Sequence, residues 1–124
     1  MIALPATVRV YAAVEPVDLR AGFDPLAHHV RELIALDPLS GALFLFFNRR
    51  ANRAKVLCFT STGYYLVYKR LEHGRLRLPR AVTAGAHRLE MSAAELALVL
   101  EGVDLRGAPR ARGWAPVEKS PPSR

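Results

Sequence analysis

The sequence predicts a single α+β domain in which an antiparallel β-meander packs against two helices. The chain has 124 residues, about one domain, and its 51% hydrophobic and 23% charged residues are typical of a folded protein. Its middle part holds short apolar segments separated by brief polar turns, and two other segments have apolar residues at helical spacing. We expect residues 1–106 to form the domain and residues 107–124, rich in proline, glycine and charge, to form a flexible C-terminal tail.

The first part of the domain is predicted to be a strand followed by a helix. Residues 8–14 alternate weakly and are rich in β-branched side chains, which favours a strand. Asp24 followed by Pro25 predicts a helix start, because the carboxylate can accept from free backbone N–H groups and proline at the first helical position loses no hydrogen bond. The Asp37-Pro38 pair predicts its end after about three turns. One face of this helix is apolar: Leu26, Val30, Leu33 and Ile34.

The middle of the chain is predicted to be a β-meander. Strands are expected in residues 42–47, 54–60 and 64–70, with a fourth in residues 74–79. The links between them are short, so consecutive strands must be antiparallel neighbours. We expect one face of this sheet to pack on the helices and the opposite face to present arginine.

The last elements are a short strand in residues 87–90 and a second helix. Ser92 and Glu95 have the spacing of a capping box, in which each side chain accepts a hydrogen bond from the backbone N–H of the other. Gly102 is a natural helix stop.

The basic charge is concentrated in one segment. The formal net charge is +7, yet residues 44–80 hold nine basic side chains and one acidic one. This concentration favours a basic face that contacts an anion, and the anion we expect is a nucleic-acid backbone. The alternative is a solvated loop whose charge only keeps a hairpin soluble. The predicted contacts are Arg49, Arg50, Arg53, Lys55, Lys69, Arg70, Arg75 and Arg77.

Cysteine usage and hydropathy favour a cytoplasmic location. The single cysteine, Cys58, cannot form an internal disulfide, and its apolar neighbours favour a buried, inert thiol. No apolar run approaches the length of a membrane span, and the N-terminus lacks the features of a signal peptide.

The sequence contains little that indicates catalysis or a cofactor. It has no glycine-rich phosphate loop, closely spaced cysteine pair or metalloprotease motif. Asp24, His28 and Glu32 recur every four residues and could bind a divalent cation, but we favour the absence of a metal, because histidines are common on amphipathic helices. We expect neither a catalytic residue nor a cofactor.

Two further groups of residues have alternative interpretations. Asp18 and Arg20 are expected to form an ion pair that fixes the turn before the first helix, in preference to a catalytic role. Tyr64, Tyr65 and Tyr68 are expected to pack in the core or across strands, in preference to stacking on nucleic-acid bases.

Three ordered blocks carry a family resemblance. They read DLRAGFDPLA, DPLSGALFLFFNRRANRAKVLCF and GYYLVYKRLEHGRLRLPR, and with them the chain resembles, from about residue 8 to residue 80, the TnpB (Orf2) accessory protein family of the insertion sequences numbered sixty-six. The resemblance implies a protein encoded beside a transposase and needed for efficient transposition without being the catalytic subunit. The transposase and other proteins of the same element are therefore implied partners.

The predicted function is that of a non-catalytic accessory protein in DNA transposition that binds element DNA or the transposase–DNA complex through its basic hairpins. The competing hypothesis is an adaptor that contacts the transposase through protein surfaces without binding DNA. A third, less favoured hypothesis is a metal-dependent nuclease built around His28 and Glu32.

Overall fold

Five strands form one mixed sheet in the order β4-β3-β2-β1-β5. The computed structural model describes residues 7–106, so the tail predicted for residues 107–124 lies outside the described residues. The strands are β1 (Val10–Ala13), β2 (Leu43–Phe47), β3 (Arg53–Thr60), β4 (Gly63–Arg70) and β5 (Arg88–Met91). The helices are α1 (Phe23–His29), which continues as a π-helical turn η1 (Val30–Ile34), and α2 (Ala93–Leu100).

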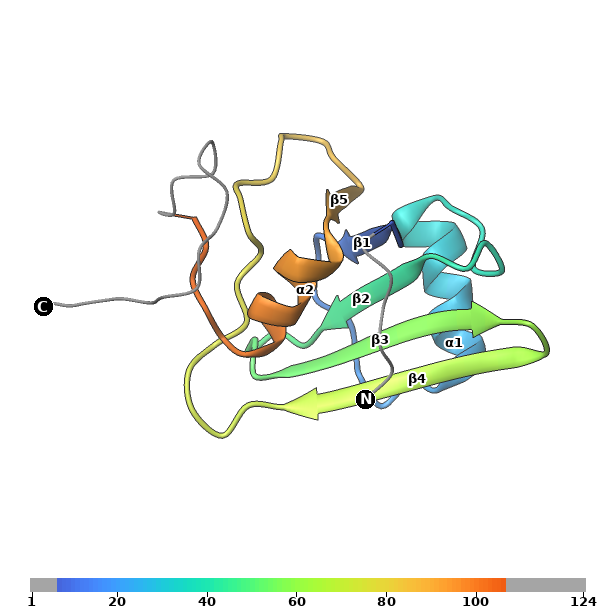
Figure 1. Ribbon diagram of the computed structural model, residues 1–124, viewed down its shortest axis with the longest axis horizontal. Coiled ribbons are helices and arrows are strands. Elements are labelled where there is room, and N and C mark those ends of the chain that lie inside the picture. The colour runs from blue at the N-terminus through green and yellow to red at the C-terminus, as the bar shows by residue number, and fades with distance from the viewer. Residues whose placement is uncertain (1–6, 107–124) are drawn as a thin grey trace, which may run out of the picture.

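The connections combine a crossover with the predicted meander. Strands β2, β3 and β4 follow one another as antiparallel neighbours. The chain reaches β2 from β1 through α1, and β1 and β2 are parallel, as a crossover helix requires. Strand β5 pairs antiparallel with β1 at the far edge of the sheet (Figure 1). Because β1 and β2 are parallel, their carboxyl ends lie at the same end of the sheet.

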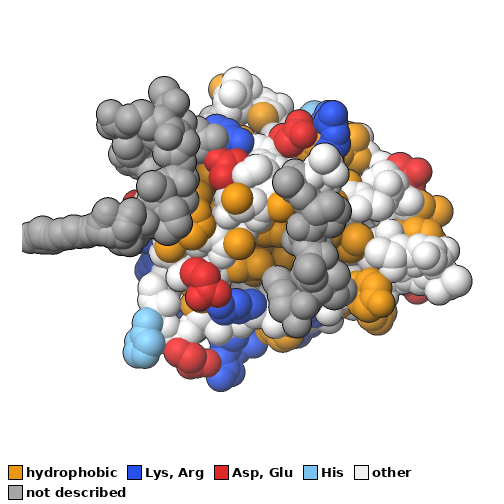
Figure 2. All heavy atoms as spheres, viewed as in Figure 1, with side chains coloured by type: hydrophobic (Ala, Val, Ile, Leu, Met, Phe, Trp, Pro, Cys, Tyr) orange, Lys and Arg blue, Asp and Glu red, His pale blue; other side chains and the backbone are white. Residues whose placement is uncertain are grey.

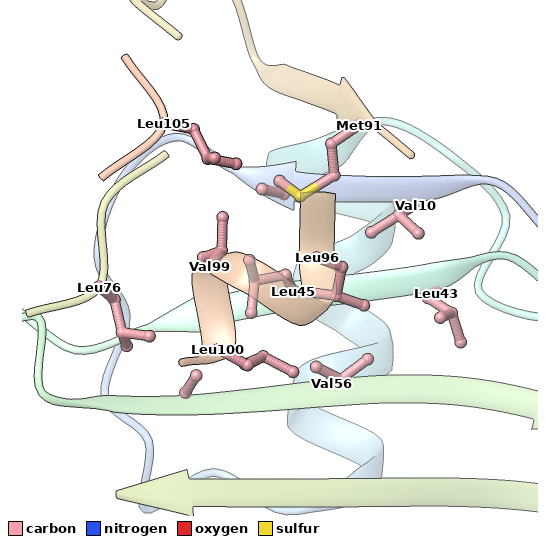
Figure 3. Packing of buried hydrophobic residues seen from close by; sticks show 12 residues of the cluster. Val10, Leu43, Leu45, Val56, Leu76, Met91, Leu96, Val99, Leu100 and Leu105 are labelled. Carbon is pink, nitrogen blue, oxygen red and sulfur yellow. The ribbon is translucent and has the colours of Figure 1, made fainter. Parts of the chain in front are cut away.

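The two helices cover opposite faces of the sheet, which corrects the expectation that both would cover one face (Figure 1). On one side, side chains of α1 and η1 form a core with Phe44, Phe46 and Leu57. On the other side, α2 packs over Leu45 and Val56, and Figure 3 shows its leucine and valine side chains above these strands. The physical reason is that β2 is apolar on both faces, so each face needs a cover.

Most predicted elements are present, with corrected bounds. Residues 74–79 do not form a strand; Leu76 is instead buried in the α2-side core, and its N–H donates to the Ala51 carbonyl over 2.7 Å. Helix α1 begins after Gly22, so Asp24 lies in its first turn rather than capping it. The helical segment ends at Ala35, which adopts a left-handed conformation before the Asp37-Pro38 pair.

The capping box predicted for α2 is confirmed. The Ser92 hydroxyl accepts from the Glu95 N–H over 3.0 Å, and the Glu95 carboxylate accepts from the Ser92 N–H over 3.0 Å. Strand β5 ends at Met91, immediately before the cap. Met91 and Leu96 lie on either side of the cap, and both are buried in the core between α2 and the sheet. Neither helix within residues 7–106 has the length and apolar content needed to cross a bilayer.

The loop between β2 and β3 is held by the Asn48 side chain. Its oxygen accepts from the backbone N–H groups of Asn52 and Arg53, both over 3.0 Å, and its amide donates to the Asn52 side-chain oxygen over 2.7 Å. Ala51 adopts a left-handed conformation with φ 57°, which is unusual for a residue with a Cβ. The bonds from Asn48 and from Leu76 fix this loop from two sides, so residues 49 and 50 project from a rigid base.

Replacing Ser92 by alanine should lower the free energy of unfolding by about 1 kcal/mol, because α2 loses its capping oxygen. Chemical denaturation measures this change. Ser92→Asp, which restores an acceptor, should recover most of the stability, and equal losses in both variants would contradict a capping role.

Replacing Asn48 by alanine should lower the free energy of unfolding by about 1–3 kcal/mol, because two part-buried backbone N–H groups lose their acceptor. Asn48→Asp keeps an acceptor oxygen and should retain most of that stability in the same denaturation experiment. An alanine variant as stable as the parent protein would show that the loop does not depend on this side chain.

Candidate functional site

A cleft of about 490 Å³ lies beside the loop between β2 and β3. We call it the arginine cleft, because four arginines and a single carboxylate line it. Its lining residues are Pro16, Val17, Asp18, Leu19, Arg20, Asn48, Arg49, Arg50, Arg53 and Tyr68. Its volume lies within the range of typical ligand sites.

The arginine cleft forms where the parallel strands β1 and β2 end. Residues 16–20 follow β1, residues 48–50 follow β2, and the Val17 N–H donates to the Phe47 carbonyl over 2.9 Å. This bond holds the two segments side by side, although 30 residues separate them in the sequence. The cleft thus depends on the parallel pairing of β1 with β2.

Asp18 and Arg20 form the ion pair that the sequence predicted. The Arg20 guanidinium donates to both carboxylate oxygens of Asp18, with its Nη2 at 2.6 Å, and the Arg20 backbone N–H also donates to Asp18. These bonds lower the pKa of the Asp18 carboxyl to about 2 and raise the pKa of Arg20. A carboxylate with so low a pKa stays ionised at neutral pH and is a poor general base.

Three of the predicted contacts meet in the arginine cleft without a carboxylate partner. Arg49 and Arg50 are exposed at the loop tip, and within residues 7–106 neither forms an ion pair. Arg53 is partly exposed, and its guanidinium donates to the Tyr68 hydroxyl over 2.6 Å. This trio gives the cleft its net positive charge.

Lys55 does not contribute an exposed cation. Only 9% of it is exposed, and its ammonium donates to the Ala21 carbonyl over 2.8 Å. The same ammonium lies 4.9 Å from the centre of the Tyr68 ring. Lys55 therefore links β3 to the turn before α1, and we remove it from the predicted contacts.

None of the remaining predicted contacts lines the arginine cleft, so the eight cations do not form a single surface. Lys69 and Arg77 pair with Glu101 and Asp104 at 2.8 and 3.8 Å. On the face that carries α2, basic and acidic side chains are interspersed around an apolar area (Figure 2). Arg70 points to the opposite side of β4 from Lys69 and lies opposite Arg53 in the β3–β4 register, but it pairs with Glu72 at 2.7 Å.

Arg75 is exposed in the segment between β4 and β5, and no acidic partner is present among the described residues. It does not line the arginine cleft. Its place in an irregular segment, rather than on the predicted fourth strand, separates it from Arg49 and Arg50.

The tyrosines differ from one another. Tyr64 packs against Phe59 and Phe23, as expected for cross-strand packing. Tyr65 and Tyr68 are 52% and 50% exposed, so they do not lie in the core, but Tyr68 does contact a residue across the strands, because the Lys55 ammonium lies over its ring. Tyr68 lines the arginine cleft and lies opposite Lys55 in the β3–β4 register, a placement that depends on the strand pairing.

Neither a metal site nor a reactive thiol emerges from the described residues. Within residues 7–106 no three histidine, cysteine, aspartate or glutamate side chains are grouped so that they could hold a metal ion, so Asp24, His28 and Glu32 do not form a ligand set. Cys58 is half-buried, and this burial raises the pKa of its thiol, which lowers the thiolate fraction at neutral pH.

The arrangement is suited to binding an oxyanion. Guanidinium groups bind phosphate through parallel N–H donors, and three of them lie without carboxylate partners around one cleft. The lining of the cleft includes no histidine, serine or cysteine, and its one carboxylate is bonded to Arg20. The cleft therefore has the groups for recognition and lacks a nucleophile paired with a general base.

Comparison with known proteins places the chain in a family. The model of the family described as IS66 Orf2 like protein matches residues 8–110. Two proteins of Sinorhizobium fredii (strain NBRC 101917 / NGR234) are similar along most of their length. The uncharacterized protein y4hO is 40% identical over 99 residues, covering 80% of this chain and 84% of the relative. The uncharacterized protein y4jC is 32% identical over 124 residues, covering 100% of this chain and 96% of the relative.

No solved structure matches the chain. The family match spans most of the sequence and confirms the resemblance carried by the three sequence blocks. The chain belongs to the IS66 Orf2-like family, which implies an accessory role in the transposition of insertion sequences.

Proposed function

We propose that this protein serves transposition as a non-catalytic factor that binds element DNA through the arginine cleft. The observation that supports this most is the trio Arg49, Arg50 and Arg53, which lies around one cleft without carboxylate partners among the described residues. Phosphate is the anion that such a group of guanidinium donors fits best in a protein of a DNA-mobilising element.

The position of the cleft supports the same proposal. Ligands of open sheets with parallel strands bind outside the carboxyl ends of those strands, where the loops converge. The arginine cleft lies at the carboxyl ends of β1 and β2. The rigid base that Asn48 gives to the loop lets Arg49 and Arg50 meet a phosphate with little loss of backbone entropy.

The adaptor hypothesis has one observation in its favour. Strand β4 is an edge of the sheet, eight residues long, and its outer backbone groups have no strand partner among the described residues. Such an edge can accept an added strand from another protein. Tyr65, 52% exposed on the α2 side of this edge, would then contact the added strand.

The double substitution Arg49→Ala and Arg50→Ala should weaken DNA binding and its dependence on salt. Each lost phosphate contact flattens the slope of log affinity against log salt by about 0.9 on duplex DNA and about 0.7 on single strands. Two lost contacts should therefore flatten it by about 1.4–1.8. Fluorescence anisotropy titrations across a salt series measure both quantities.

The matched control is Lys69→Ala with Arg77→Ala, which removes the same charge from cations that are already paired. This control should change the slope much less. Equal effects of the two double variants would contradict a specific role of the arginine cleft. A complex with the transposase that survives nuclease treatment, together with no DNA affinity of the protein alone, would favour the adaptor.

The substitution Asp18→Asn should strengthen DNA binding. The pKa of about 2 means that the Asp18 carboxylate stays charged at neutral pH, where it neutralises Arg20 and repels phosphate. The asparagine oxygen can still accept from the Arg20 backbone N–H, so the turn should persist. Arg20 then becomes an additional phosphate ligand, and the salt slope should steepen by about 0.7–0.9.

Asp104→Asn is the control for this variant, because it makes the same charge change beside Arg77 and Arg106. A gain in affinity as large as that of Asp18→Asn would attribute the effect to overall charge, and the arginine cleft would lose its support.

A further inference from the structure

We propose that the nucleic acid bound at the arginine cleft is single-stranded, with unpaired bases stacked on aromatic side chains along the α1 side of β4. This inference rests on the proposed function, since the arginines supply the phosphate contacts. It adds the structural class of the DNA, which the phosphate contacts alone leave open.

Tyr68 has the geometry of a stacking platform. It is 50% exposed, and its hydroxyl accepts from Arg53 over 2.6 Å. The buried Lys55 ammonium lies over the ring, 4.9 Å from its centre, and so covers one ring face. The ring is therefore held at its tip and on one face, and the proposal assigns its other face to a base beside the arginine trio.

A second aromatic group lies farther along the same side of β4. Phe23 is 47% exposed and stacks on Tyr64 with ring centres 6.4 Å apart, and Tyr64 contacts Phe59 edge-on at 5.2 Å. Tyr64 and Tyr68 are four residues apart on one strand, so they point to the same side and lie about 13 Å apart. A stacked strand with a rise of about 3.4 Å per nucleotide covers this span with about four nucleotides.

Duplex DNA fits this surface poorly. In a duplex each base is covered by its neighbours, and freeing a base face costs a few kcal/mol per step. Proteins that read duplex DNA commonly insert a helix into the major groove. Helix α2 contains no lysine or arginine, and α1 with η1 contains only Arg31 together with Asp24 and Glu32. Exposed aromatic rings beside unpaired arginines are instead the combination found in binders of single strands.

Anisotropy titrations with a labelled thymidine oligonucleotide and with a duplex of the same length test the proposal. The parent protein should bind the single strand more tightly. Tyr68→Ala should weaken single-strand binding by about tenfold, within the range of about 5- to 150-fold expected for the loss of one stacked base. Tyr68→Phe, which keeps the ring, should retain most of the affinity, and duplex binding should change little in either variant.

Tyr65→Ala is the matched control, because Tyr65 is 52% exposed on the opposite side of β4. It should leave single-strand affinity unchanged. Phe23→Ala tests the second aromatic group. Tyr68→Leu removes the ring but keeps an apolar side chain, and it replaces Tyr68→Ala if the alanine variant does not fold. Phe23→Ala and Tyr68→Leu should each weaken single-strand binding more than duplex binding.

The outcomes separate this inference from the proposed function. Equal affinity for the two DNA forms, or unchanged single-strand binding in the Tyr68→Ala, Tyr68→Leu and Phe23→Ala variants, would overturn the single-strand inference even if Arg49→Ala with Arg50→Ala still weakens binding. No effect of the arginine substitutions on either DNA form would overturn both.

Discussion

The double-sided burial of β2 is the constraint on which the rest of the structure depends. Its five residues alternate between Leu43 and Leu45 on the α2 side and Phe44 and Phe46 on the α1 side, and these four side chains are at most 4% exposed. A strand with two apolar faces must be central and needs a layer on each side. That requirement separates the helices and brings β1 alongside β2. The loops that leave the carboxyl ends of both strands then meet and form the arginine cleft.

Local patterns predicted the elements well. Ser92 and Glu95 form a capping box because both partners lie within one helical turn. The meander follows from short loops, which leave antiparallel pairing as the only option. The prediction that both helices cover one face of the sheet was wrong, because the apolar run at residues 42–47 was taken as a strand with only one buried face. Its continuous apolar character was the available signal for burial on both faces. The predicted strand at residues 74–79 failed because a tertiary hydrogen bond from Leu76 to Ala51 replaced a strand partner.

The candidate site was only partly predictable, because its charges depend on partners far along the chain. Arg49, Arg50 and Arg53 were found, since a short loop keeps them together. Lys69 pairs with Glu101, which lies 32 positions later in the chain. The buried Lys55 ammonium donates to the Ala21 carbonyl, which lies 34 positions earlier. A charge count along the sequence records how many cations a segment has and cannot record where their partners lie. Arg20 joined the cleft through the backbone bond between Val17 and Phe47, which has no sequence signature.

The distribution of partners gives the two sides of the hairpins different characters. On the α2 side, two carboxylates from the segment that follows α2, those of Glu101 and Asp104, pair with Lys69 and Arg77. The one carboxylate that lines the arginine cleft belongs to Asp18 and is bonded to Arg20, so Arg49, Arg50 and Arg53 have no carboxylate partner among the described residues. A protein with a pI near 10.3 would attract DNA over its whole surface if its cations were equally free. The pairing of Lys69 and Arg77 on the α2 side therefore fits the proposal that DNA is drawn to the arginine cleft, where Arg53 also contacts the Tyr68 hydroxyl.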